Sequence, residues 1–94
     1  MPKPKIEFKI SINFLKEGEK FIAYSPVLDL STCGDTLEQV KKRFEEAAGI
    51  FFEETVKNGT LENALLNLGW QKIQKVWQPP VFIGQGFQQV AFAM

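Results

Sequence analysis

An unbroken alternation of apolar and polar side chains from Lys5 to Phe14 constrains the fold of this chain more than any other feature of its sequence. Successive side chains of a β-strand point to opposite faces of a sheet, so this period of two predicts a strand with one apolar face. The residues of that face are Ile6, Phe8, Ile10, Ile12 and Phe14. Such a strand is stable when partner strands and a covering layer bury its apolar side.

The next segments supply the partner strands. Gly18 suits a turn that needs a positive φ, and an extended apolar run, residues 21–24, follows it, so the two runs predict a β-hairpin. Pro26 ends the second strand, because proline cannot donate a hydrogen bond to a sheet. Residues 28–33 then predict a third short strand, which completes an antiparallel meander.

A long amphipathic helix follows and predicts the covering layer. Asp35 is a suitable N-cap, and Glu38 stands where a capping-box acid favours the free amides of the first turn. Asn58 and Gly59 are suited to end the helix. Apolar and small side chains at three- and four-residue spacing predict one buried stripe. Its members are Leu37, Val40, Phe44, Ala47, Ala48, Phe51 and Thr55, widened by Phe52 and Val56.

Residues 60–69 predict a second, short helix. Thr60 is its candidate N-cap and Gly69 its terminator. The leucines expected on its buried side are Leu61, Leu65 and Leu68. Trp70, which follows the helix, and Trp77 are expected in the core or in an interface.

The C-terminal part predicts extended structure. Residues 70–77 mix apolar and polar side chains ambiguously, and two consecutive prolines interrupt whatever they form. Residues 81–83 and 89–94 have the composition of strands. The predicted class is therefore α+β, with an antiparallel three-stranded meander packed by a long helix, a second short helix and C-terminal strands. The whole chain, residues 1–94, is expected to form a single domain.

The stretch between residues 21 and 54 carries the most informative motifs. The motif residues are, in order, Phe21, Ile22, Ala23, Tyr24, Ser25 and Pro26, then Leu28 and Asp29, then Gly34, Asp35, Thr36, Leu37 and Glu38. Their order and spacing resemble the HicB-like antitoxin family, in which an aromatic strand end, a small residue and a proline lead through a Gly-Asp-Thr turn into a helix. The resemblance covers residues 6 to about 58 and implies a partial ribonuclease H-like fold.

The resemblance implies an antitoxin-like protein that neutralises a small HicA-type RNA-cleaving toxin by protein-protein contact, without a cofactor. Two alternatives stay open: a stand-alone structural or regulatory binding module without a toxin partner, and a degenerate ribonuclease H-like nuclease. A nuclease needs several carboxylates that converge on Mg²⁺, and Asp29 and Asp35 are the candidate pair. Because the chain has no histidine and no third acid placed to join them, we expect no enzymatic activity and no metal site.

Charge and composition constrain the partners and the compartment. Eleven Lys and Arg balance eleven Asp and Glu, so the chain lacks the basic excess typical of nucleic-acid binding, and we expect no DNA binding. Many HicB-like proteins continue into an operator-binding domain, but no basic helix follows Asn58.

The single cysteine, Cys33, has no histidine to activate it and is expected to be a small core residue. No apolar run is long enough to span a bilayer, so we expect no membrane partner and a cytoplasmic location.

Ile50 is the first candidate interface residue. It falls on the polar side of the long helix, where an apolar side chain indicates either a contact beyond the sheet or a chance residue without a function. The neighbouring Gly49 costs a helix about 1 kcal/mol relative to alanine and would allow another segment to approach closely.

The C-terminal segment 81–94 is the second candidate interface. It has no charged side chain to keep it solvated. Its large apolar residues are Phe82, Phe87, Val90, Phe92 and Met94, together with Val81 and Ile83. We expect a homodimer in which this segment crosses to a second protomer and adds a strand to an exposed sheet edge. The alternative is that it folds back onto its own sheet.

Overall fold

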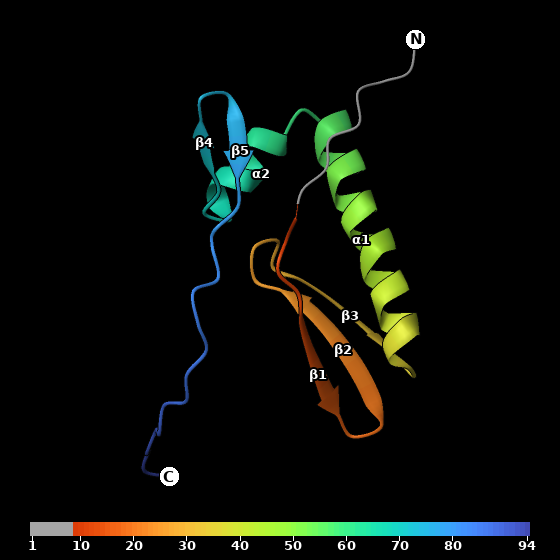
Figure 1. The fold of residues 1–94 in the computed structure, drawn as a ribbon, viewed down its shortest axis with the longest axis vertical. Coiled ribbons are helices and arrows are strands. Elements are labelled where there is room, and N and C mark those ends of the chain that lie inside the picture. Colours follow the sequence, from red (N-terminus) through yellow and green to blue (C-terminus); the bar gives the residue numbers. More distant parts are fainter. Residues whose placement is uncertain (1–8) are drawn as a thin grey trace.

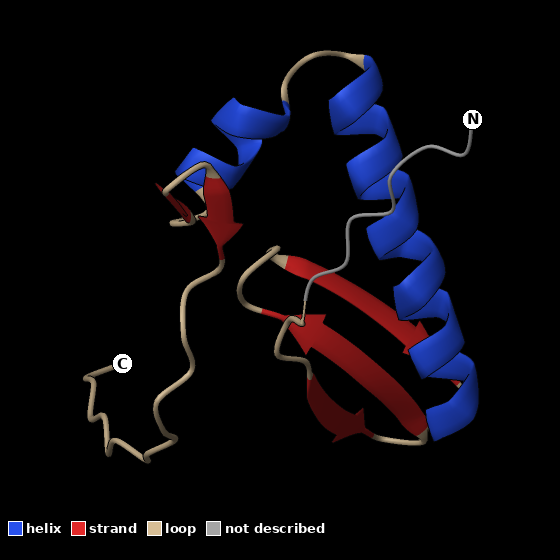
Figure 2. Cartoon of the chain, turned by 45° about the horizontal axis from the view of Figure 1, so that its top comes forward, coloured by secondary structure: helices blue, strands red, loops and turns tan. Residues whose placement is uncertain are grey.

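The computed structural model describes residues 9–94 (Figure 1). Its elements are, in chain order, β1 (Asn13–Glu17), β2 (Lys20–Ser25), β3 (Leu30–Gly34), α1 (Leu37–Lys57), α2 (Leu61–Asn67), β4 (Gln71–Ile73) and β5 (Val76–Gln78). The first three strands form an antiparallel sheet in the order β1-β2-β3, and β4 pairs with β5 in a separate antiparallel sheet. α1 packs mainly on β3 and β2 (Figure 2). The α+β class and the order of its elements are confirmed.

The first strand begins later than the alternation predicts. Residues 9–12 are not in a strand, and the predicted strand positions 5–8 lie outside the described residues. The register explains the late start, because Asn13 pairs with Tyr24 and β2 ends one residue later, before Pro26. Residues before Asn13 therefore have almost no residues of β2 opposite them with which to form backbone hydrogen bonds. The predicted apolar face is still recognisable, since Ile10 and Ile12 pack against the core.

The connection between β2 and β3 belongs to the core and not to the third strand. Val27 and Leu28 are buried, although both precede the first residue of β3. Asp29 follows them with a φ of 49°, in the left-handed region, and Leu30 begins the strand. The predicted start of the third strand at residue 28 was therefore wrong, because the chain reverses direction through a tight turn there.

Thr36, and not the predicted Asp35, caps α1. The Gln39 amide donates to Thr36 Oγ1 at 3.0 Å, and the Asp35 amide donates to Gln39 Oε1 at 2.7 Å, which forms a Thr-x-x-Gln variant of the capping box. Asp35 instead pairs through its carboxylate with Lys20 at the start of β2. The hydrogen bond from Lys20 and then its positive charge lower the pKa of Asp35.

The predicted helical stripe is buried in the N-terminal half of the helix, half-buried in its C-terminal half and exposed at both ends. Val40 and Phe44 are buried, whereas Leu37 and Val56 are exposed. The remaining members, Ala47, Ala48, Phe51, Phe52 and Thr55, are half-buried. The cause is a difference in length, since a helix of 21 residues is about 30 Å long, and strands of five or six residues span about 20 Å at most.

The core joins the sheet to the C-terminal half of the chain. Its buried apolar residues are Ala23, Val27, Leu28, Val40, Phe44, Leu65 and Trp70. Trp70, which is 2% exposed, donates from Nε1 to the Val27 carbonyl at 2.7 Å. The predicted second helix is confirmed, with Leu65 buried and with Gly69 after it at a φ of +88°.

The C-terminal strands lie in residues 71–78, and not in residues 81–83 and 89–94 as the composition predicts. No strand forms after Gln78, because no partner strand meets these residues within one copy. The C-terminal segment 81–94, which we call the tail, extends away from the helices (Figure 1). The radius of gyration is 16.1 Å, compared with the roughly 12 Å typical of a compact chain of this length. No helix among residues 9–94 has the length and apolar content to cross a bilayer.

Candidate protein-binding surfaces

The two carboxylates that a nuclease would require lie at opposite ends of β3. Asp29 precedes the strand and Asp35 follows it. Six residue steps, through the five residues of β3, place their Cα atoms roughly 20 Å apart, too far for the two carboxylates to share one Mg²⁺ ion. Within residues 9–94, no group of three or more His, Cys, Asp or Glu side chains is placed to hold a metal ion.

Asp29 has a structural partner. The Tyr24 hydroxyl donates to Asp29 Oδ1 at 3.1 Å across the turn between β2 and β3. The pKa of Tyr24 is raised, first by this hydrogen bond, then by desolvation and by the negative charge of Asp29. The folded protein therefore retains the phenolic proton of Tyr24 to higher pH than an unfolded chain. The hydrogen bond to Asp29 stabilises the fold at lower pH, and this stabilisation is lost as the pH rises through the folded pKa of Tyr24.

The Asp29→Asn variant should lower the pKa of Tyr24 towards its ordinary value. Asparagine tolerates the left-handed backbone of this position, so the change removes the charge and keeps the turn. Tyr24 is the single tyrosine of the chain, so an ultraviolet absorbance titration reports it directly. Glu19→Gln, which removes a carboxylate outside this turn, is the control. A titration curve that does not move in Asp29→Asn would refute the assigned cause.

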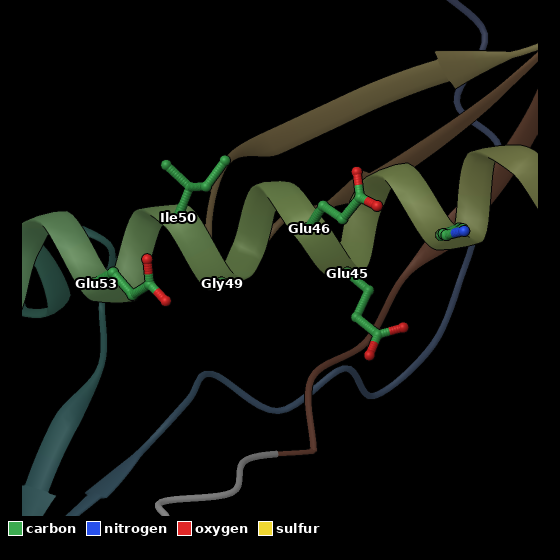
Figure 3. Close-up of a pocket in the computed structure, with 6 residues that line it drawn as sticks. Glu45, Glu46, Gly49, Ile50 and Glu53 are labelled. Carbon is green, nitrogen blue, oxygen red and sulfur yellow. The ribbon is translucent and has the colours of Figure 1, made fainter.

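Ile50 lies on the outward side of α1 in a shallow hollow (Figure 3). The hollow is lined by Lys42, Glu45, Glu46, Gly49, Ile50 and Glu53, which we call the Ile50 surface. Ile50 is 59% exposed. Ile50 and Glu46 project to one side of the helix, while Glu45 and Glu53 project to the other side, with Gly49 between them (Figure 3). An apolar group thus stands in the middle of an acidic surface.

The Ile50 surface suits a protein partner better than a small molecule. Small-molecule sites are concave and enclose most of the ligand. All the residues that line this hollow belong to one helix, so it has no opposite wall. Three glutamates and one lysine give it a negative charge. Among the described residues none of these carboxylates forms an ion pair, so all three are available to a basic partner.

Gly49→Ala should stabilise the isolated protein by about 1 kcal/mol, because alanine is the better helix former. A Cβ at this position would meet no atom within 4 Å, so a methyl group fits without strain. Urea denaturation followed by circular dichroism measures the change. Gly18→Ala is the control, because its φ of +60° makes a side chain strained there. A loss of stability in Gly49→Ala would mean that the helix is crowded at this position.

The tail carries the other predicted interface residues, and all of them are exposed. The exposed fractions of Phe82 and Phe87 are 55% and 97%, and Val90, Phe92 and Met94 are also exposed. The tail leaves β5 on the side of the molecule away from α1 (Figures 1 and 2). The sequence-predicted residues therefore fall into two separate groups, the Ile50 surface and the tail.

The face of the sheet that points away from α1 holds an apolar row that sequence reasoning missed. Leu15 pairs with Ile22, and Ile22 pairs with Cys33, so the three side chains form a row across the sheet. Leu15 is 50% exposed. Cys33 is exposed and does not occupy the core position expected of it. The signal was present in the sequence, because Leu15 follows Phe14 directly and breaks the alternation.

Comparisons of the chain with family models, with curated proteins and with solved structures give no match. The resemblance to HicB-like antitoxins stays a prediction from the motifs of residues 21–54.

Proposed function

We propose that this chain is an antitoxin-like protein that binds and neutralises a small HicA-type RNA-cleaving toxin, and that it does so without catalysis. The observation that carries the proposal is the Ile50 surface, where an exposed apolar side chain is surrounded by glutamates. A protein that binds RNA presents Lys and Arg side chains to the phosphates. An inhibitor that covers such a site gains affinity and orientation from opposite charge.

Ile50 and Gly49 supply the apolar contact and the close approach that the charged residues of this surface do not provide. Exposed charge pairs contribute about 0–1 kcal/mol each, and tight complexes depend on a few apolar groups buried at the centre of the interface. Ile50 is the apolar group of this surface, and the missing side chain at Gly49 lets a partner approach the helix backbone beside it. The glutamates then form the polar rim.

A stand-alone binding module without a toxin is the competing function. It would use the same surfaces, so the partner distinguishes the two. No observation favours the nuclease, since Asp29 and Asp35 lie at opposite ends of β3. We place the function in the cytoplasm, where a toxin would meet its RNA, and expect no binding to operator DNA from a chain whose formal charge is zero.

Binding to the product of a short toxin-like reading frame beside the gene of this chain tests the proposal. Calorimetry with the two purified proteins should give a defined complex whose affinity falls as the salt concentration rises, because opposite charges are screened. Glu45→Lys/Glu46→Lys should weaken that complex at low salt, whereas Glu17→Lys/Glu19→Lys, with the same change of charge at the end of β1 and in the turn after it, should not. The absence of a toxin-like reading frame, or of binding to its product, would favour the stand-alone module.

We further infer that the chain forms a homodimer through its tail. The support is the exposed, uncharged and largely apolar segment 81–94, which needs a covering surface. Truncation after Gln78 leaves every helix and strand intact, and sedimentation of the truncated chain should show a monomer. An unchanged dimer after this truncation would exclude the tail as the dimer contact.

A further inference from the structure

We propose that the tail of each copy adds a strand to the open edge of β1 in the second copy. The proposal rests on the tail-mediated homodimer put forward above, and it identifies the surface that receives the tail. Two features of residues 9–94 support it: the uncharged extended tail has no partner strand, and the β1 edge of the sheet has no strand beside it.

β1 is the accessible edge of the three-stranded sheet. Among the described residues β1 pairs with β2 alone, and all five of its residues are exposed. The opposite edge strand, β3, lies against α1. Arg43 of α1 donates from Nη1 to the Cys33 carbonyl at 2.8 Å, and Thr32 Oγ1 donates to the Val40 carbonyl at 3.3 Å. Side chains and backbone of the helix therefore engage β3, whereas β1 offers unpaired backbone groups to a new strand.

The large side chains of the tail, which share one face, can pair with one of the two exposed apolar side chains of the β1 edge. Phe14 points to the α1 side of the sheet and is 44% exposed, while Leu15 points to the opposite side. A strand beside β1 places its alternate side chains next to each of them. Residues 89–94 alternate large and small, with Val90, Phe92 and Met94 on one side and alanines between them. Apolar cross-strand pairs of this kind contribute about 0.2–1 kcal/mol each.

A second copy of the chain is the proposed partner, because within one copy both the tail and the β1 edge remain unpaired. The tail stays extended and exposed in the single chain, although its own β1 edge is open. A two-fold dimer makes the exchange twice and uses the same surfaces on both protomers. The three phenylalanines of each tail, at about 150 Å² each, bury on the order of 900 Å² over two copies. The aliphatic side chains bring this area towards the 1,200–2,000 Å² of stable interfaces.

Cross-linking between differently tagged copies tests the pairing, in a Cys33→Ser background that removes the native thiol. Lys16→Cys on β1 and Ala91→Cys in the tail are introduced into separate copies, which are mixed and treated with a short bismaleimide. The expected product is a covalent heterodimer. Ser31→Cys on β3 is the control, because this exposed position lies on the edge that α1 covers, and it should not link to Ala91→Cys.

The outcomes distinguish two questions, namely whether a dimer forms and whether β1 is the edge that receives the tail. A sedimentation dimer without the link from β1 to the tail, or with a link from β3 to the tail, overturns the β1 assignment and leaves the homodimer standing. A monomer in sedimentation overturns both. One chain that carries Lys16→Cys and Ala91→Cys together and links internally at high dilution shows that the tail returns to its own sheet, which also overturns the proposal.

A matched pair of substitutions gives a second measure that does not depend on cysteines. Leu15→Lys places a charge on the proposed edge and should weaken dimerisation at least tenfold. Leu66→Lys changes a leucine of α2 with similar exposure, 57% against 50%, and should leave dimerisation unchanged. Equal effects of the two substitutions would refute a specific role of β1.

Discussion

Replacing Trp70 with alanine should lower the free energy of unfolding by about 3–5 kcal/mol, the range for truncating a large buried aromatic side chain. Trp70 is 2% exposed and belongs to the buried core with Leu65 of α2 and Val27 of the β2-β3 connection. Trp70 therefore connects the C-terminal half of the chain to the sheet through packing and a hydrogen bond. A domain of this size has a total stability of about 5–15 kcal/mol, so the variant should be close to unfolding at room temperature.

Two further variants separate the contributions of Trp70. Trp70→Phe keeps most of the apolar volume but removes the hydrogen bond to the buried Val27 carbonyl, and leaving this acceptor unpaired should cost about 1–3 kcal/mol. Trp77→Ala removes a tryptophan that is half-buried at the margin of the core, so its effect should be smaller. Urea denaturation followed by far-ultraviolet circular dichroism avoids dependence on tryptophan fluorescence. A Trp70→Ala variant no less stable than Trp77→Ala would contradict the assigned role.

Ile50→Glu should weaken binding of the proposed toxin by about 2 kcal/mol, or roughly 30-fold, the size expected for a residue central to an interface. The added charge has the sign that a basic partner attracts, so a loss of affinity isolates the apolar contact. Ile50 is 59% exposed, so folding stability should change little. Calorimetry with the proposed toxin measures the affinity.

Leu66→Glu is the matched control for Ile50→Glu. Leu66 is an exposed apolar residue of similar accessibility, 57%, but it lies on α2, outside the Ile50 surface. Its substitution should leave the affinity unchanged. If Ile50→Glu binds the toxin as tightly as the unmodified chain, Ile50 is a neutral surface residue and the toxin binds elsewhere.

Local signals in the sequence predicted the elements that depend on neighbours along the chain. Gly18 has the positive φ expected of the hairpin turn, and Gly69 follows α2 with a positive φ. The period of the apolar residues predicted α1, and Val40 and Phe44 are buried on its expected side. These features follow from backbone conformation and from the period of a helix, which a single sequence encodes directly.

The errors fall where partners distant in the sequence decide the structure. The alternation of residues 5–14 predicts a strand, but β1 pairs no further than β2 extends, and β2 stops before Pro26. Asp35 and Thr36 are both good caps, and the Lys20 partner of Asp35 comes from another strand. The tail has strand composition but meets no strand within one copy.

The candidate surfaces were predictable in part. An apolar residue on the polar side of an amphipathic helix indicated Ile50, and an uncharged apolar segment indicated the tail. Both are exposed, and their role as interfaces stays a prediction. The exposed row of Leu15, Ile22 and Cys33 depends on the register of three strands, which the sequence pattern did not provide. The acidic surroundings of Ile50 arise from the helical period, since Glu46 and Glu53 lie four residues before it and three after it.

Titration of the toxin's RNA cleavage with this protein tests the central claim most directly. The substrate RNA, Mg²⁺ and a fixed amount of the proposed toxin are mixed with increasing amounts of the chain. We expect cleavage to fall to zero near one equivalent, the chain alone to leave the RNA intact, and Ile50→Glu to shift the titration to higher concentration. Continued cleavage at a large excess of the chain, or cleavage of RNA by the chain itself, would contradict the antitoxin-like function.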